Sequence, residues 1–298
     1  MRVFITGGSG FVGSGVVRQL IAAGHEVTGL ARSEASAAAL RAAGAKVLTG
    51  ELTDLDRVAA GADAADGVIH CGFIHDFANF GHSVEVDRRA IAAFGDALAG
   101  SGRPLLVTSG VAGLSFGRPT TEEDEPDPSV YESVPRVSEQ TGLALAARGI
   151  KAGVVRLPPS VHGARDHGFV PILIAIARQK GVSAYIDAGD NRWPAVHRDD
   201  AAALYRLALE QGAAGQRHHA IGDEGVAFRD IASVIGRQLG VPVASIPLSA
   251  AAEHFGWFGR FAAMDVPASA ALTRARLGWA PTGPGLIEEL EQDIYFAA

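Results

Sequence analysis

The chain has 298 residues, of which 48% are hydrophobic and 20% charged, and its formal net charge is −7. This composition is typical of a compact soluble protein of one or two domains, and an acidic balance without a run of basic residues argues against nucleic acid as a partner. Cys71 is the only cysteine, which excludes an intramolecular disulfide and a cysteine-based metal cluster. The longest apolar run, residues 170–177, is too short to span a bilayer, and the chain starts directly in a predicted strand. We therefore expect a cytoplasmic protein with no membrane partner.

Residues 2–6 have the pattern of a buried strand that runs directly into a glycine-rich turn and a helix. Gly7 is expected to make the turn, Gly10 to let phosphates approach the backbone, and Gly13 to let the helix lie close on the strand. An ordinary glycine-rich turn is the alternative, but the flanking strand and helix favour a dinucleotide site. The predicted cofactor contacts in this turn are Gly7, Ser9, Gly10, Phe11, Val12 and Gly13.

The second predicted strand, residues 26–30, carries information about the type of dinucleotide. A carboxylate at the end of this strand normally accepts hydrogen bonds from the adenosine ribose of NAD, and none is present here. Arg32 and Ser33 follow instead, which leaves room for a 2′-phosphate and supplies a guanidinium and a hydroxyl to hold it. The sequence thus favours NADP over NAD, although an arginine that opens a helix can also be simply solvated.

Strands and helices alternate through the first half of the chain. Strands are predicted at residues 2–6, 26–30, 46–49, 67–71, 105–108 and 151–156, and helices at residues 10–23, 34–43, 55–60, 84–99 and 135–148. This rhythm predicts an α/β fold, a Rossmann doubly wound parallel sheet with a smaller C-terminal substrate lobe. We expect residues 1–156 to form an NADP-binding domain to which residues 191–222 return, and residues 157–190 and 223–298 to form the substrate-binding lobe.

Five segments together resemble the short-chain dehydrogenase/reductase superfamily: residues 6–13, 50–54, 68–71, 155–163 and 196–201. Their order and spacing are similar to its extended or atypical branch, which includes NADP-dependent ketoreductases, nucleotide-sugar epimerases and dehydratases. The resemblance covers nearly the whole chain. It implies that Glu51 and Leu52 contact the adenine, and ordinary packing at strand ends is the alternative. It also implies that the cofactor passes Cys71, Gly72 and Phe73, and that the nicotinamide is bordered by Pro158, Ser160 and Val161.

The resemblance weakens at the catalytic residues. The family normally uses a tyrosine as proton donor, a lysine four residues later and an upstream serine. Tyr131 is the only tyrosine in the right region, but Pro135 occupies the lysine position, and the nearest cation, Arg136, stays protonated and can assist only electrostatically. The family serine aligns on or beside Gly110, so Ser109 is the nearest hydroxyl, and it faces either the nicotinamide or the sheet.

Other polar and aromatic residues have two interpretations each. Asp87 stands where many relatives carry asparagine, and it either binds a water in a proton relay or is a carboxylate on a helix surface. His162 and His197 either contact the substrate or make ordinary loop hydrogen bonds, and their spacing gives no support to a metal site. Phe169 and Trp193 either shape an apolar pocket or fill the core of the second lobe.

We therefore expect an NADP-dependent oxidoreductase that reduces a small, apolar or aromatic ketone or aldehyde. Tyr131, helped by Ser109 or a water, would protonate the carbonyl oxygen, and Asp87 and Arg136 are further catalytic candidates. A nucleotide-sugar epimerase or dehydratase is the first alternative, but no diphosphate clamp is recognisable. A non-catalytic NADP(H)-binding sensor is the second, since the catalytic set is incomplete. A homodimer through the helices at residues 84–99 and 135–148 is expected by resemblance only.

Overall fold

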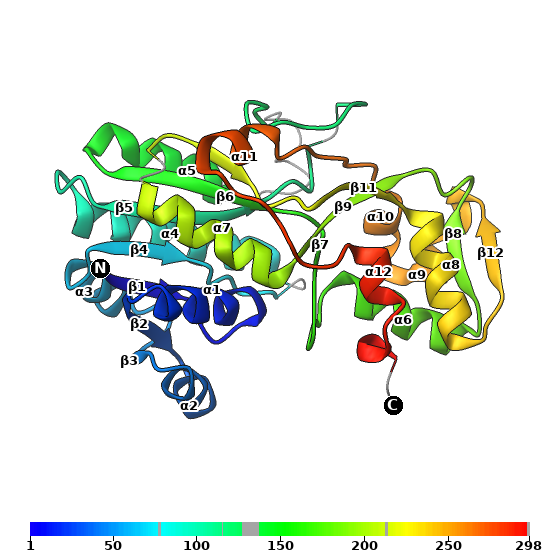
Figure 1. Cartoon of the computed structure of the whole chain (residues 1–298), viewed down its shortest axis with the longest axis horizontal. Helices are drawn as coiled ribbons and strands as arrows, with labels where there is room; N and C mark the ends of the chain where they lie inside the picture. The colour runs from blue at the N-terminus through cyan, green and yellow to red at the C-terminus, as the bar shows by residue number, and fades with distance from the viewer. Residues whose placement is uncertain (77–78, 115, 127–136, 212–213, 297–298) are drawn as a thin grey trace.

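The computed structural model describes residues 1–76, 79–114, 116–126, 137–211 and 214–296. Its main part is a seven-stranded sheet with the order β10-β6-β5-β4-β1-β2-β3, in which every neighbouring pair is parallel (Figure 1). The strands are β1 (Arg2–Thr6), β2 (Glu26–Ala31), β3 (Lys46–Thr49), β4 (Gly67–His70), β5 (Pro104–Gly110), β6 (Lys151–Leu157) and β10 (Arg217–His219). This is the predicted doubly wound Rossmann sheet, extended by β10 at one edge.

Helices cover both faces of this sheet because right-handed crossovers must link parallel strands. One face carries α1 (Phe11–Ala22), α2 (Glu34–Ala42) and α7 (Arg198–Gln211), and α1 packs against α7 (Figure 1). The other face carries α3 (Leu55–Asp63), α4 (Phe80–Leu98), α5 (Ser138–Ala144) and the 3-10 turn η2 (Leu145–Arg148). Side chains alternate across the strands, so Leu106 belongs to the first face and Leu105 and Val107 to the second.

The second part of the molecule lies beyond the carboxyl ends of the main strands and has a core of its own (Figure 1). It contains a three-stranded sheet, β11-β9-β7, and a parallel pair, β12 and β8. Its strands are β7 (Ser160–His162), β8 (Ser183–Ile186), β9 (Arg192–His197), β11 (Asp223–Ala227) and β12 (Val243–Ile246). Its helices are α6 (Phe169–Lys180), α8 (Phe228–Leu239), η3 (Leu248–Ala250), α9 (Ala251–Phe255), η4 (Gly256–Phe258), α10 (Gly259–Ala262), α12 (Leu286–Leu290) and η5 (Asp293–Tyr295). The remaining helix, α11 (Ala271–Leu277), contacts β10 and α7 of the main part.

The predicted elements occur with small differences in length. α4 begins at Phe80, four residues before the prediction. η2 ends at Arg148, as predicted, and the φ of +74° at the following Gly149 stops the helix. Within residues 191–222, α7 and β10 belong to the main part, whereas β9 pairs with β7 and β11 of the second part. The division into a cofactor domain and a substrate domain stays a prediction. Among the described residues, no helix has the length and apolar character needed to cross a membrane.

Candidate functional site

A cavity of about 910 Å³ lies at the carboxyl ends of the main strands and extends to the second part of the molecule. Ligands of doubly wound sheets bind in this position, outside the carboxyl ends of the strands. The cavity brings together most of the residues that the sequence predicts as cofactor or substrate contacts. These are Gly7, Ser9, Gly10, Phe11, Val12, Gly13, Arg32, Glu51, Leu52, Cys71, Gly72, Phe73, Ser109, Pro158, Val161 and Phe169.

The glycine turn between β1 and α1 has no space for a side chain at Gly7 or at Gly13. Gly7 has a φ of +69°, and a Cβ added there would lie 2.7 Å from backbone atoms of Cys71 and Gly72. A Cβ on Gly13 would lie 2.1 Å from the Gly7 carbonyl oxygen. α1 starts at an extended Gly10 without a side-chain cap or an acidic residue in its first turn, so its free N–H groups and positive dipole end remain available to an anion. This geometry fits the pyrophosphate of a dinucleotide.

Arg32 and Ser33 lie at the end of β2 but differ in their surroundings. Arg32 is exposed and lines the cavity, and within the described part of the chain its guanidinium makes no hydrogen bond or ion pair. Ser33 does not line the cavity. Its Oγ caps α2 by accepting a hydrogen bond from the Ser36 N–H at 3.2 Å, and Ser36 is the hydroxyl residue that lines the cavity next to Arg32. Ser36 was not predicted as a cofactor contact, because the sequence does not show that the Ser33 hydroxyl is used to cap α2 while Ser36 faces the cavity.

Two of the residues predicted to border the cofactor, Cys71 and Ser160, are partly and fully buried, respectively. Cys71 lines the cavity, but burial raises the pKa of its thiol to about 11, so it stays protonated at neutral pH. The hydroxyl groups of Thr108 and Tyr205, which also line the cavity, form a hydrogen bond of 2.7 Å with each other beside the Cys71 thiol. Ser160 is buried outside the cavity lining, and its Oγ has no partner among the described residues.

The predicted catalytic residues are only partly placed. Ser109 is nearly buried at the end of β5, on the face that carries Val107, and it lines the cavity together with Gly110. Tyr131 and Arg136 lie outside the described residues, so their roles stay predictions. The described segments on either side end at Pro126 and resume at residue 137, and Pro126 itself lines the cavity.

Asp87 is buried inside the main part, so its interpretation as a helix-surface carboxylate is wrong. Its Oδ1 lies 3.0 Å from His70 Nε2, and its Oδ2 accepts a hydrogen bond from the Ser138 hydroxyl at 2.5 Å. His70 Nδ1 lies 2.6 Å from Thr6 Oγ1, which in turn accepts the Gly72 N–H at 3.2 Å. Asp87 does not line the cavity. It closes a buried chain of polar side chains from β1 to the start of α5, since a buried carboxylate requires such partners.

A second buried cluster includes a cavity residue that the sequence did not single out. Glu139 on α5 lines the cavity and accepts two hydrogen bonds from Arg156, at 2.6 and 2.7 Å, and one from Arg217 at 2.6 Å. These guanidinium groups hold the pKa of the Glu139 carboxyl below its usual value despite its burial. Arg156 also donates to the carbonyl of Asp124. The sequence signal for the Arg156–Glu139 pair is the position of Arg156 inside the apolar run of β6, because a buried cation needs a carboxylate nearby.

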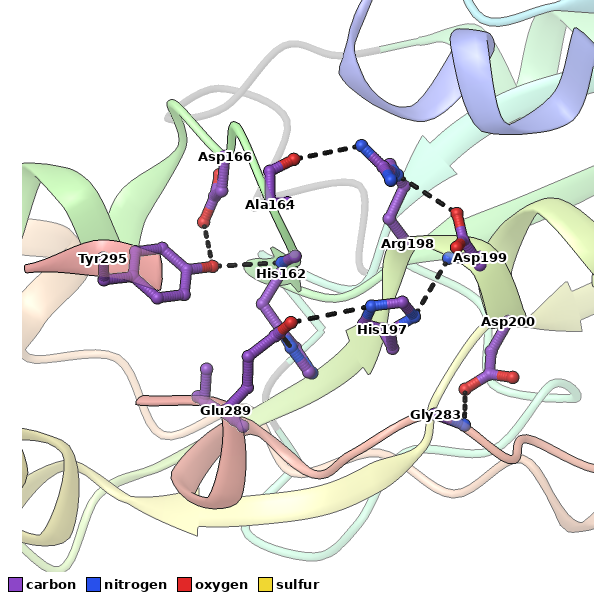
Figure 2. A network of polar contacts seen from close by, with 12 residues as sticks. His162, Ala164, Asp166, His197, Arg198, Asp199, Asp200, Gly283, Glu289 and Tyr295 are labelled. Atoms are coloured by element: carbon purple, nitrogen blue, oxygen red, sulfur yellow. Dashed lines mark hydrogen bonds and ion pairs between the residues drawn. The ribbon is translucent and has the colours of Figure 1, made fainter. Parts of the chain in front are cut away.

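The predicted substrate residues separate into one that lines the cavity and three that do not. Phe169 lines the cavity and packs against Trp193 and Phe261. Trp193 is fully buried in the second core, so its core interpretation holds and it does not shape the cavity. His162 and His197 lie behind the cavity wall, where both rings face Glu289, as Figure 2 shows. Among the described residues, no group of three or more His, Cys, Asp or Glu side chains could hold a metal ion.

Comparison with known proteins places the chain in a family. Residues 3–222 match the model of the NAD dependent epimerase/dehydratase family. An uncharacterized protein of Schizosaccharomyces pombe is 50% identical over 298 residues, which cover 99% of this chain and 100% of the relative. A 4-hydroxy-2-methyl-3-oxo-4-farnesyl-3,4-dihydroquinoline-1-oxide ketoreductase of Stigmatella aurantiaca is 29% identical over 272 residues, 86% of this chain and 80% of that enzyme.

The fold is also similar to solved structures. DesIV, a dTDP-glucose 4,6-dehydratase of Streptomyces venezuelae solved with NAD and TYD bound, superposes with a TM-score of 0.79 over 99% of this chain and 97% of that one. Its sequence identity is 20%, so this likeness concerns the fold alone. The match of the family model to residues 3–222, about three quarters of the chain, shows that the protein belongs to the NAD dependent epimerase/dehydratase family, in the extended branch of the short-chain dehydrogenases/reductases.

Proposed function

We propose that this protein is an NADP-dependent oxidoreductase that reduces the carbonyl group of a small, apolar or aromatic ketone or aldehyde. The observation that carries the proposal is the composition of a single cavity. The glycine turn and Arg32 line the end formed by the main part, and Phe169 of α6 and Phe261 of α10 line the end formed by the second part. The ketoreductase relative from Stigmatella aurantiaca supports the reaction type, and the NAD bound to DesIV supports a nicotinamide dinucleotide as cofactor.

The residues at the first end fit the proposed cofactor. The N–H groups at the start of α1 would hold the pyrophosphate, and Arg32 with Ser36 would hold the 2′-phosphate of the adenosine ribose. Glu51 and Leu52, which follow β3, would border the adenine. When bound, the reduced dinucleotide supplies a hydride, and the protein supplies position and the exclusion of water.

The second end of the cavity favours an apolar substrate over a nucleotide sugar. Phe169, Ile172 and Phe261 line this end, and Phe73, Ile74, Phe80 and Leu114 of the main part add apolar lining to the same cavity. Among the described lining residues, Arg32 is the single arginine or lysine, and it lies at the adenosine end. A second diphosphate would need further cations, so the described walls offer no clamp for a nucleotide sugar.

Protonation of the carbonyl oxygen is assigned to Tyr131, with Ser109 donating to the same oxygen from the end of β5. Pro135 supplies no charge that would lower the tyrosine pKa, so Arg136 is the nearest cation in sequence that could favour the phenolate. Cytoplasmic location and a homodimer through α4 and α5 also belong to the proposal.

The experiment measures NADPH oxidation with a panel of aromatic and aliphatic ketones for the wild type and Tyr131→Phe. A rate in the wild type that is lost in Tyr131→Phe supports the reductase and its proton donor. An unchanged rate in the variant retains the reductase and rejects Tyr131. Tight NADPH binding without turnover of any ketone would favour the non-catalytic sensor. The absence of the family lysine, whose position is occupied by Pro135, supports this alternative.

A further inference from the structure

One wall of the cavity is held in place by the C-terminal segment of the chain. Asp166 lines the cavity, and its Oδ1 accepts the Gly168 N–H at 2.7 Å. The Tyr295 hydroxyl donates to Asp166 Oδ2 at 3.0 Å, and its oxygen accepts the Gly163 N–H at 3.1 Å. Tyr295 thus joins both sides of the loop that leads from β7 to α6, although it lies 129 residues beyond Asp166 (Figure 2).

The same wall has further attachments. Glu289 lies between His162 and His197. Its Oε2 contacts His162 Nδ1, and its Oε1 is 3.6 Å from His197 Nε2. The guanidinium of Arg198 donates to the carbonyl of Ala164 at 3.1 Å (Figure 2). Arg165, at the centre of the loop, has a φ of +69°, which a residue other than glycine adopts only when its surroundings impose it. The position of Asp166 is therefore set by contacts from two distant segments.

The carboxylate of Asp166 stands beside an apolar surface. Phe169, Ile172 and Phe261 line the same end of the cavity. Burial raises the pKa of Asp166 above its usual value, which reflects the cost of keeping the charged form there. A carboxylate offers about four acceptor sites, and the two donors found among the described residues, the Gly168 N–H and the Tyr295 hydroxyl, use one on each oxygen. Acceptor sites therefore remain there for a donor in the cavity. A wholly apolar ligand would remove water from this group without replacing the lost hydrogen bond.

We propose that Asp166 is a specificity-determining substrate contact, which accepts a hydrogen bond from a hydroxyl group of an otherwise apolar carbonyl substrate, and that Tyr295 is its positioning residue. This inference rests on the proposed reductase function and narrows its substrate class to hydroxylated ketones or aldehydes. A site built around a hydroxyl group discriminates against the analogue that lacks it, because the buried acceptor is then left unpaired.

The test compares acetophenone with 2-, 3- and 4-hydroxyacetophenone in NADPH oxidation. The variants are Asp166→Ala, Asp166→Asn, Tyr295→Phe and, as a matched control, Tyr185→Phe, which removes a tyrosine hydroxyl of β8 outside the cavity lining. We expect the wild type to prefer at least one hydroxy derivative about tenfold through a lower KM. Asp166→Ala abolishes this preference, Asp166→Asn retains part of it, Tyr295→Phe reduces it about threefold, and Tyr185→Phe leaves it unchanged. NADPH affinity stays within about twofold in all variants, which shows that they are folded.

Calorimetric titration of the same four ketones into the protein loaded with NADP+ separates this inference from the reductase proposal. If no ketone oxidises NADPH but a hydroxy derivative binds more tightly and loses that advantage in Asp166→Ala, the reductase proposal fails and the substrate contact stands. If ketones are reduced but the wild type shows no preference, or the preference survives in Asp166→Ala, the assignment of Asp166 is overturned. An unchanged preference in Tyr295→Phe rejects the positioning role alone.

Discussion

Replacement of Arg32 by alanine is expected to weaken NADPH binding and leave NADH binding unchanged. Arg32 is exposed, lines the cavity and makes no hydrogen bond or ion pair within the described residues, so its removal breaks no structural contact there. The measured loss would then report the contact to the 2′-phosphate alone. Hydrogen bonds to charged groups contribute about 1.5–3 kcal/mol, which corresponds to roughly a 10- to 150-fold increase in the Kd for NADPH.

The assay is titration of NADPH and of NADH, followed by cofactor fluorescence or calorimetry, for the wild type and the variant. Arg41→Ala is the matched control, because Arg41 lies on α2 close to Arg32 in sequence, is paired with Glu34, and does not line the cavity. The NADPH affinity of the wild type should fall with ionic strength more steeply than that of Arg32→Ala. Equal losses for NADPH and NADH in Arg32→Ala would refute the assignment of this guanidinium to the 2′-phosphate, and no loss for either would place the phosphate elsewhere.

Further predictions concern the cavity walls and the buried clusters. Gly13→Ala should abolish binding of both dinucleotides in either titration, because its Cβ would lie 2.1 Å from the Gly7 carbonyl oxygen and force α1 away from β1. Glu139→Gln should lower the free energy of unfolding in urea by about 3–5 kcal/mol, since it leaves the buried Arg156 charge uncompensated, whereas Glu85→Gln on the surface of α4 should cost under about 1 kcal/mol. Burial lowers the pKa of His218 from 6.5 to about 4. Between pH 6.5 and 4 the imidazole of His218 therefore binds a proton in the unfolded chain but not in the folded one. The free energy of unfolding should fall as the pH falls through this range, by up to about 1.4 kcal/mol per pH unit. His218→Asn should flatten this part of the stability profile measured by urea unfolding, and an unchanged slope would contradict a neutral buried His218.

The sheet and the glycine turn could be predicted because their signals are local. The apolar strands β1 to β6 and the helices between them follow from hydrophobic periodicity and glycine punctuation. No strand was predicted at the position of β9, and its apolar residues Trp193 to Val196 are compatible with either core. A buried strand carries no sequence signal for its neighbour, so its partners follow from the packing of the whole chain.

The polar contacts of the site were less predictable, because they join residues far apart in the sequence. Asp87 and Ser138 are 51 residues apart, and Tyr295 meets Asp166 across 129. A single sequence shows that a carboxylate occurs in a helix or a loop but does not show which donor meets it. The sequence therefore leaves Asp87 either on a helix surface or bound to a water, and it does not identify Asp166 as a residue of the site.

The buried chain that contains Asp87 is related to the cavity in a regular way. Thr6, His70 and Ser138 are each followed in the sequence by a residue that lines the cavity: Gly7, Cys71 and Glu139. These hydrogen bonds therefore anchor the chain directly beside three residues of the cavity wall. Satisfied buried networks are rigid, and a rigid wall would suit the proposed reductase, in which the cofactor would supply the hydride and the protein would mainly fix distances and exclude water. In the proposed reductase this wall would not require a lysine at position 135, because Thr6, His70 and Ser138 are held by hydrogen bonds to one another and to Asp87.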